Sequence, residues 1–363
     1  MAIRIPTAYT AGDPNRTLNR AVPFRGGPNS LCAFDDRRDA SVASYVGVFH
    51  PLSHFPRQNI RVTPTLADET PSGIEEQLET SSPPPNPSLT RRSFLALSAA
   101  SVGGFAVYAG EVSRHELTVE EHTIQLPRLP DAFRGMRIVQ VSDFHYAEYT
   151  EPYFLREIVH RINQLRPDMV VLIGDFISFG PMPKAFARRC MPHCAEILTA
   201  IECPLRYATL GNHDYYAGPH FVTGCLQDHG FPVLTNRAIA LERDGRHVWL
   251  AGLGSACEHG SDPARGIPRA VQKEPVILLA HEPDILPDIA RYNVDLMLSG
   301  HTHGGQVRLP FLPLMHLPEY GKKYIEGWFR YGPTQLYVNR GIGTTGVPFR
   351  FRCPPEITVI TLA

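Results

Sequence analysis

The sequence has few cysteines, almost no net charge and no long run of strongly apolar residues. Seven cysteines, spread from Cys32 to Cys353 over 363 residues, do not form the dense disulfide framework of a small secreted domain. A formal net charge of -1 provides no overall attraction to nucleic acid or to an anionic membrane. We therefore expect no nucleic-acid partner, and a fold held together by a hydrophobic core, for which 43% hydrophobic residues is ordinary.

The first 89 residues differ in composition from the rest of the chain. They are rich in proline, serine, threonine and arginine, and their apolar residues follow neither a helical nor a strand period. Too few apolar residues cluster there to offset the entropy lost on ordering the segment. We predict that residues 1–89 are disordered, and the sequence assigns them no function.

A pair of arginines, Arg91 and Arg92, precedes an uncharged stretch over residues 96–110. This pattern resembles a twin-arginine export signal, with Val107-Tyr108-Ala109 as a weak candidate cleavage site. The stretch is shorter than the roughly 20 strongly apolar residues that span a bilayer, which favours a signal over a permanent transmembrane helix. We expect the twin-arginine machinery to export the protein to the periplasm or the outer face of the cytoplasmic membrane. The alternative is a buried helix in a cytoplasmic, membrane-associated protein.

The expected signal, residues 90–112, lies unusually far from the first residue for an export signal. We therefore expect translation to start shortly before Arg91. No methionine lies between Met1 and Met136, so such a start requires a non-ATG codon. Residues 113–363 then form the catalytic domain.

From residue 120 onward, short apolar runs alternate with amphipathic segments, as in α/β domains. We predict strands at residues 136–141, 168–173, 205–210, 276–280, 296–299, 335–339 and 357–362, and a hairpin at 239–253 that turns at Asp244-Gly245. Helices are predicted at residues 151–165 and 185–201, with another between 218 and 230.

Polar motifs follow five of these strands directly. Their candidate ligands and catalytic groups are Asp143, His145, Asp175, Asn212, His213, Asp214, His281, His301 and His303. The carboxyl ends of strands in open α/β sheets are where loops bring distant residues together. All of these side chains offer nitrogen or oxygen, so the set predicts a site for two divalent cations, Mn²⁺, Fe²⁺ or Zn²⁺.

The motifs D-x-H, GD, GNHD, H and GHTH occur in the order seen in the calcineurin-like metallophosphoesterase superfamily, which this chain resembles. Residues 281–284, 300–306 and 337–357 resemble its bacterial YkuE/YaeI-type phosphodiesterase branch. The resemblance covers about residues 116–362. It implies a four-layer α/β/β/α sandwich, with two mixed β-sheets flanked by helices, and hydrolysis of a phosphodiester or pyrophosphate bond.

The same resemblance implies a role for each motif residue. Asp143, His145 and His303 would hold one cation, Asp175 would bridge both, and Asn212, His281 and His301 would hold the second. A hydroxide activated by the cations would attack phosphorus. His213 would give a proton to the leaving oxygen or stabilise its charge, while Asp214 would orient and charge the His213 ring.

Substrate choice is predicted from residues 307–330, which are apolar, aromatic and basic. We expect a loop at the rim of the site that faces a lipid-linked phosphoester, with Arg308, Lys322, Lys323 and Arg340 facing phosphate. The alternative is a hydrophobic loop packed on the domain.

Similar enzymes include ones that cleave UDP-2,3-diacylglucosamine, but UDP-sugars are cytoplasmic and an exported domain would not meet them. Nucleases share this type of metal site, yet no dense basic stripe accompanies it in this sequence. A non-catalytic metal-binding scaffold would be expected to lack some of the ligands or the acid.

Overall fold

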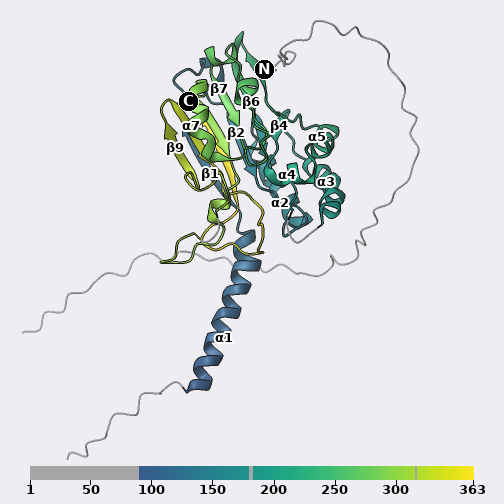
Figure 1. Cartoon of the computed structure of the whole chain (residues 1–363), viewed down its shortest axis with the longest axis vertical. Coiled ribbons are helices and arrows are strands. Elements are labelled where there is room, and N and C mark those ends of the chain that lie inside the picture. Colours follow the sequence, from purple (N-terminus) through teal and green to yellow (C-terminus); the bar gives the residue numbers. More distant parts are fainter. Residues whose placement is uncertain (1–89, 180–182, 315–316) are drawn as a thin grey trace, which may run out of the picture. The chain divides into compact units, whose positions relative to one another are not determined.

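The computed structural model describes residues 90–179, 183–314 and 317–363, and the predicted disorder of residues 1–89 lies outside them. The described part contains two mixed β-sheets with helices on their outer faces (Figure 1). This confirms the expected α/β fold class and its α/β/β/α layers.

The first sheet has five strands in the order β1-β11-β2-β3-β4. These are β1 (Thr118–Ile124), β11 (Glu356–Leu362), β2 (Arg137–Ser142), β3 (Met169–Ile173) and β4 (Leu205–Thr209). Strands β2, β3 and β4 are parallel, whereas β11 runs antiparallel to β2. The carboxyl ends of β2, β3 and β4 therefore meet at one edge.

The second sheet has six strands in the order β5-β6-β7-β8-β10-β9. These are β5 (Arg237–Arg243), β6 (Arg246–Gly252), β7 (Val276–Leu279), β8 (Leu296–Ser299), β10 (Thr334–Val338) and β9 (Gly327–Tyr331). Its four central strands are parallel and the two outer strands antiparallel. The β5-β6 pair is the predicted hairpin with its turn at Asp244-Gly245.

Helices cover the outer face of each sheet. On the first sheet these are α2 (Pro152–Leu165), α3 (Lys184–Leu198) and α5 (Pro219–Asp228), while the short α4 (Asn212–Ala217) follows β4 directly. The outer face of the second sheet packs against α6 (Pro263–Gly266) and α7 (Leu286–Ile289). The hydrophobic layer between the two sheets is a separate cluster.

The sequence of strand β3 is continuously apolar because both of its faces are buried. Val170 and Leu172 belong to the cluster under the first-sheet helices, whereas Met169 and Val171 belong to the layer between the sheets. Successive side chains of a strand point to opposite faces, and both faces of β3 are buried. Alternate side chains of this one strand thus pack into the two hydrophobic clusters.

The prediction of a loop over residues 307–330 is wrong at its end, because residues from Gly327 onward form strand β9. Trp328 packs against the layer between the sheets and Phe329 against the outer cluster, so the two side chains alternate as in a strand. Its partner β10 comes later in the sequence, and the proline- and glycine-rich segment before it hid the strand pattern.

The predicted export segment forms α1 (Arg91–Val107), which begins at the N-cap Thr90. Helical structure of other types carries it on to His115, and the 25 residues Arg91–His115 are long and apolar enough to cross a membrane by length and composition. The sequence had predicted a shorter apolar segment. None of the α1 side chains is buried, whereas Ala109 and Gly110 just beyond it are.

The α2 face that packs on the first sheet gives a test of this core. We expect Ile158→Ala to lower the free energy of unfolding by about 2–5 kcal/mol, because Ile158 is completely buried and the truncation leaves a cavity. The matched control is Glu157→Ala, an exposed neighbour on the same helix, which should change stability by at most about 0.5 kcal/mol. Urea unfolding measures both, and equal effects would contradict the assigned face.

Candidate metal centre

The predicted ligands follow strand ends in both sheets. Asp143 comes directly after β2 and Asp175 two residues after β3, while His281 and His301 each lie two residues after their strands in the second sheet. The structure brings these side chains into groups whose ligand atoms lie within 4.8 Å of one another. The predicted convergence at the strand ends is confirmed.

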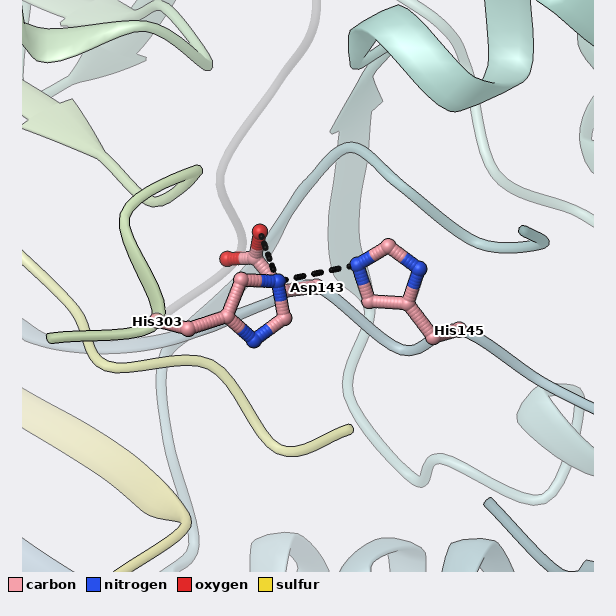
Figure 2. A group of neighbouring side chains, drawn as sticks. All are labelled: Asp143, His145 and His303. Atoms are coloured by element: carbon pink, nitrogen blue, oxygen red, sulfur yellow. Dashed lines mark hydrogen bonds and ion pairs between the residues drawn. The ribbon is translucent and has the colours of Figure 1, made fainter. Parts of the chain in front are cut away.

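The first group consists of Asp143, His145 and His303 (Figure 2). The Nε2 atoms of His145 and His303 are 3.0 Å apart, and His303 Nε2 is 3.4 Å from an Asp143 carboxylate oxygen. All three residues are buried. Two imidazole nitrogens and a carboxylate oxygen that face one another in this way suit a cation with nitrogen and oxygen ligands.

The second group consists of Asp175, His281 and His301. Asp175 Oδ2 lies 3.1 Å from His281 Nε2 and 3.7 Å from His145 Nε2, a member of the first group. The Asp175 carboxylate therefore reaches both groups, as a bridging ligand must.

Hydrogen bonds of the outer ring nitrogens determine which nitrogen of each histidine can bind a metal. His281 Nδ1 lies 2.9 Å from the Ile173 carbonyl, so it donates and leaves the Nε2 lone pair free. His301 is reversed: its Nε2 lies 2.7 Å from the Glu319 carbonyl, which leaves Nδ1 as the ligand atom. The sequence motifs carry no signal for such backbone partners.

The first group has similar support from residues that the sequence did not single out. His145 Nδ1 lies 2.6 Å from Ser178 Oγ, and His303 Nδ1 lies 3.3 Å from the Gly343 carbonyl. Both histidines therefore direct Nε2 toward the shared space. Ser178 comes three residues after Asp175, and that short spacing is the only sequence clue to its position.

Two buried polar atoms of the described residues support the presence of cations. Asn212 Oδ1 and His281 Nε2 are buried and form no hydrogen bond, although His281 Nε2 has the Asp175 carboxylate 3.1 Å away. Buried polar atoms in folded proteins almost always have a partner, and one left without it is costly. The Asn212 amide oxygen and an imidazole lone pair are both metal ligands, so the residues present fit a dinuclear metal centre.

The backbone of the candidate ligands is strained. Five of them have positive φ angles in the left-handed region: Asp143 (54°), His145 (44°), Asp175 (55°), His301 (73°) and His303 (50°). For residues other than glycine this conformation is uncommon and costs about 1–3 kcal/mol each. Strain of this kind concentrates at functional sites, where it sets the direction of a side chain.

Ionisation of His145, His303 and Asp175 matches what metal ligands require. Burial, followed by the neighbouring His213, lowers the pKa of His145 well below its usual value, and burial likewise lowers the pKa of His303. Burial acts to raise the pKa of Asp175, but the imidazoles of His281 and His213 bring it well below the usual range. Neutral imidazoles and an ionised carboxylate are the forms that bind metals. At His281 burial acts to lower the pKa, but the Asp175 carboxylate raises it well above its usual value, so a cation would have to displace a proton there.

Residues 136–305 match the family model described as calcineurin-like phosphoesterase. The chain is 36% identical over 284 residues to the uncharacterized metallophosphoesterase YkuE of Bacillus subtilis, an alignment that covers 76% of this chain and 98% of the relative. The chain belongs to the calcineurin-like phosphoesterase family. It is therefore a metallophosphoesterase, a hydrolase of phosphoester bonds, and the family depends on a dinuclear metal centre.

Two further relatives carry more specific names. The phosphodiesterase YaeI of Escherichia coli is 28% identical over 287 residues, covering 76% of this phosphoesterase and 99% of the relative. The UDP-2,3-diacylglucosamine pyrophosphatase LpxG of Chlamydia muridarum is 28% identical over 298 residues, covering 64% and 86% of the two chains.

The structure of this phosphoesterase corrects the predicted role of Asp214. Its carboxylate accepts hydrogen bonds from the backbone N–H groups of Asp175 and Gly211, at 2.8 and 3.0 Å, whereas His213 Nδ1 accepts from the Phe179 N–H at 2.9 Å. The prediction that Asp214 orients and charges the His213 ring is wrong. Helix α4 begins at Asn212, so consecutive side chains point about 100° apart.

Asp214 instead holds the loop that carries Asp175. Its carboxylate is completely buried, and burial together with the nearby Asp175 raises the pKa of Asp214 to about 8. His213, which accepts at Nδ1, carries the proton of its neutral ring on Nε2. Burial also lowers the pKa of His213 below its usual value, which favours this neutral form.

The four predicted substrate contacts lie in two settings. Arg308 Nη1 lies 2.6 Å from the Glu326 carboxylate, and Arg340 is ion-paired with Glu356 at 3.0 Å and also with Glu120. Both guanidinium groups thus already have carboxylate partners in the fold. Lys322 and Lys323 are exposed, and their backbone N–H groups donate to the Asp284 carboxylate. Contact of any of the four with phosphate remains a prediction.

Glycine 211 provides a steric test of the bridge. A Cβ atom at this position would lie 2.1 Å from an Asp175 carboxylate oxygen, and the φ angle of Gly211 is an ordinary −100°. We expect Gly211→Ala to displace the Asp175 carboxylate and to reduce bound metal from two ions per chain to one or none, as measured by elemental analysis. Gly224→Ala in α5, where a Cβ meets nothing within 4 Å, is the control that should keep full metal content. Retention of both ions by Gly211→Ala would contradict this placement of Asp175.

Proposed function

We propose that this protein hydrolyses a phosphodiester or pyrophosphate bond at a dinuclear metal site held by the two groups described above. The observation that carries the proposal is the position of the Asp175 carboxylate, 3.1 Å from His281 Nε2 and 3.7 Å from His145 Nε2. When bound, the cations supply Lewis acidity toward the phosphoryl oxygens and lower the pKa of an attacking water.

The residues around the site position the rest of the reaction. Asn212 contributes an uncharged oxygen, which leaves the second cation a stronger Lewis acid than a carboxylate would. His213, fixed by the Phe179 N–H at 2.9 Å, presents its Nε2–H as a donor. We infer that this donor stabilises the charge that develops on the leaving oxygen, since a neutral ring is a poor proton donor.

We propose a lipid-linked phosphoester or pyrophosphate of the cell envelope as the substrate class. One relative is named as a pyrophosphatase of a diacylated nucleotide sugar, and the described loop after His303 exposes Phe311 and Leu312. We keep the proposal that the twin-arginine pathway exports the protein, with Arg91 and Arg92 as the signal. An exported enzyme would act on the outer face of the membrane, where lipid-linked phosphates are accessible.

Two variants separate chemistry from metal binding. We expect His213→Asn to keep both metal ions and to lower kcat about 10²- to 10⁴-fold, because only the donor to the leaving oxygen is lost. Asp175→Asn should lose metal together with activity. Elemental analysis and hydrolysis of bis-p-nitrophenyl phosphate measure both, with His160→Asn on the exposed face of α2 as control. Full activity of His213→Asn would contradict its assigned role.

The substrate class is tested with the full chain in detergent, loaded with Mn²⁺, Fe²⁺ or Zn²⁺. A lipid-linked pyrophosphate, bis-p-nitrophenyl phosphate and single-stranded DNA are assayed in parallel. We expect the lipid-linked pyrophosphate to give the highest kcat/KM. A preference for DNA would support a nuclease, and inactivity on all three would support a non-catalytic scaffold.

A further inference from the structure

The end of the α1 segment is built into the catalytic domain. Ala109 is completely buried, and its carbonyl accepts the Arg350 N–H at 3.0 Å. A Cβ on the buried Gly110 would lie only 3.0 Å from the Phe349 ring. One turn later the buried Arg114 forms an ion pair of 2.5 Å with Glu151. The chain from residue 109 onward is therefore a packed part of the fold.

This packing bears on the candidate cleavage site Val107-Tyr108-Ala109. The site lies within continuous helical structure, because α1 ends at Val107 and a π-helix spans Tyr108–Val112. Proteolysis takes place at exposed, flexible segments rather than within packed helices. Cleavage after Ala109 would require the helix to unwind and the Ala109–Arg350 hydrogen bond to break.

The dimensions and charges of the helix suit a membrane anchor. The part of the helix outside the packed domain, α1, has 17 residues and extends roughly 26 Å at about 1.5 Å per residue. This is a few Å less than the hydrocarbon core of a bilayer, which is about 30 Å thick, and flanking side chains and local thinning of the bilayer accommodate such a mismatch. Arg91 and Arg92 lie at its start, where the positive-inside rule places cytoplasmic residues. Its other end, which enters the domain, would then lie at the outer membrane surface.

Apolar side chains surround the point where the helix enters the domain. The Phe351 ring lies 4.9 Å from the Phe105 ring and 6.3 Å from the Tyr108 ring, measured between centroids. In the same segment, Val347 is 46% exposed. These contacts place the segment beside the helix.

A second apolar segment is joined to the first. The Arg308 N–H donates to the Phe351 carbonyl at 3.0 Å, and the chain then continues to Phe311, which is fully exposed, and Leu312, which is 55% exposed. We call Phe311, Leu312 and Val347 the apolar rim. Exposed apolar side chains that lie next to one another, as Phe311 and Leu312 do, mark a contact site for an apolar partner.

The apolar rim adjoins the metal centre through the residues that follow His303. The Gln306 side chain accepts the Thr345 N–H at 3.1 Å and donates to the Val347 carbonyl at 3.0 Å. Leu314, two residues after Leu312, packs so closely on Gly305 that a Cβ there would lie 2.9 Å from it. Both parts of the rim are thus held by the turn that carries a first-group ligand.

We propose that α1 is retained as an uncleaved anchor and that the apolar rim rests in the outer leaflet of the same bilayer. The occupant of the rim is lipid, because the rim adjoins the end of a helix that has no buried side chain and whose apolar side chains need the same partner. In this arrangement the catalytic centre lies beside the bilayer and would receive the phosphate of a membrane lipid. That last step rests on the proposed function, whereas the anchor and the rim do not.

The retained anchor is tested on full-length protein extracted from membranes of the expressing cell. We expect intact-mass and N-terminal analysis to find a chain that includes Arg91 and resists extraction from membranes by alkaline carbonate. A chain that begins at Gly110 and appears in the soluble fraction would overturn the anchor.

The rim is tested by tryptophan quenching in vesicles of phosphatidylethanolamine and phosphatidylglycerol with brominated acyl chains. Phe311→Trp is compared with the control Tyr331→Trp. Tyr331 is 47% exposed and pairs with the start of β10, at the opposite end of the strand from the candidate metal ligands, which follow the ends of the parallel strands. After subtraction of wild-type emission from Trp249 and Trp328, we expect at least twofold stronger quenching for Phe311→Trp. Equal quenching of the two variants would overturn the rim.

The same variants distinguish the rim from the proposed chemistry. Turnover of bis-p-nitrophenyl phosphate in detergent requires the metal centre but no bilayer. We expect Phe311→Ser/Leu312→Ser to keep this turnover and to lower kcat/KM on a vesicle-bound lipid pyrophosphate at least tenfold. If this double variant hydrolysed both substrates as fast as the wild type does, the proposed contact of the rim with lipid would be contradicted. An inactive wild type with strong Phe311→Trp quenching would contradict the chemistry and leave the rim standing.

Discussion

The arrangement of the site depends on one carboxylate shared between two histidine groups. Asp175 Oδ2 faces His281 on one side and His145 on the other, while its Oδ1 accepts the His213 backbone N–H at 2.9 Å. A buried carboxylate among buried imidazoles is stabilised by positive charge. Two cations would supply that charge, and the folded chain supplies a rigid enclosure for them.

The enclosure exists because two sheets direct their strand ends to the same place. Asp175 and Asn212 come from the first sheet, and His281 and His301 come from the second. The apolar layer between the sheets fixes this relation, since residues of both sheets belong to it. Positive φ angles at five of the candidate ligands show that the surrounding packing holds them in conformations that isolated residues avoid.

The strand ends and the positions of the candidate ligands after them could be predicted because the signals are local. Val170 and Leu172 lie in a continuous apolar run that stops at Gly174, and a polar ligand follows at once. The partners of the ligands could not be predicted, because the carbonyls of Glu319 and Gly343 are brought to the site only by folding and backbone groups leave no mark in a sequence. The direction of Asp214 was missed because it depends on the helix starting at Asn212.

The central claim is that one carboxylate joins two cations, and electron paramagnetic resonance of the Mn²⁺-loaded protein tests it most directly. Two Mn²⁺ ions bridged by Asp175, about 3.5–4 Å apart, are exchange-coupled and should give a broad multiline spectrum at two ions per chain. A simple six-line spectrum of isolated Mn²⁺ at full loading would contradict the account.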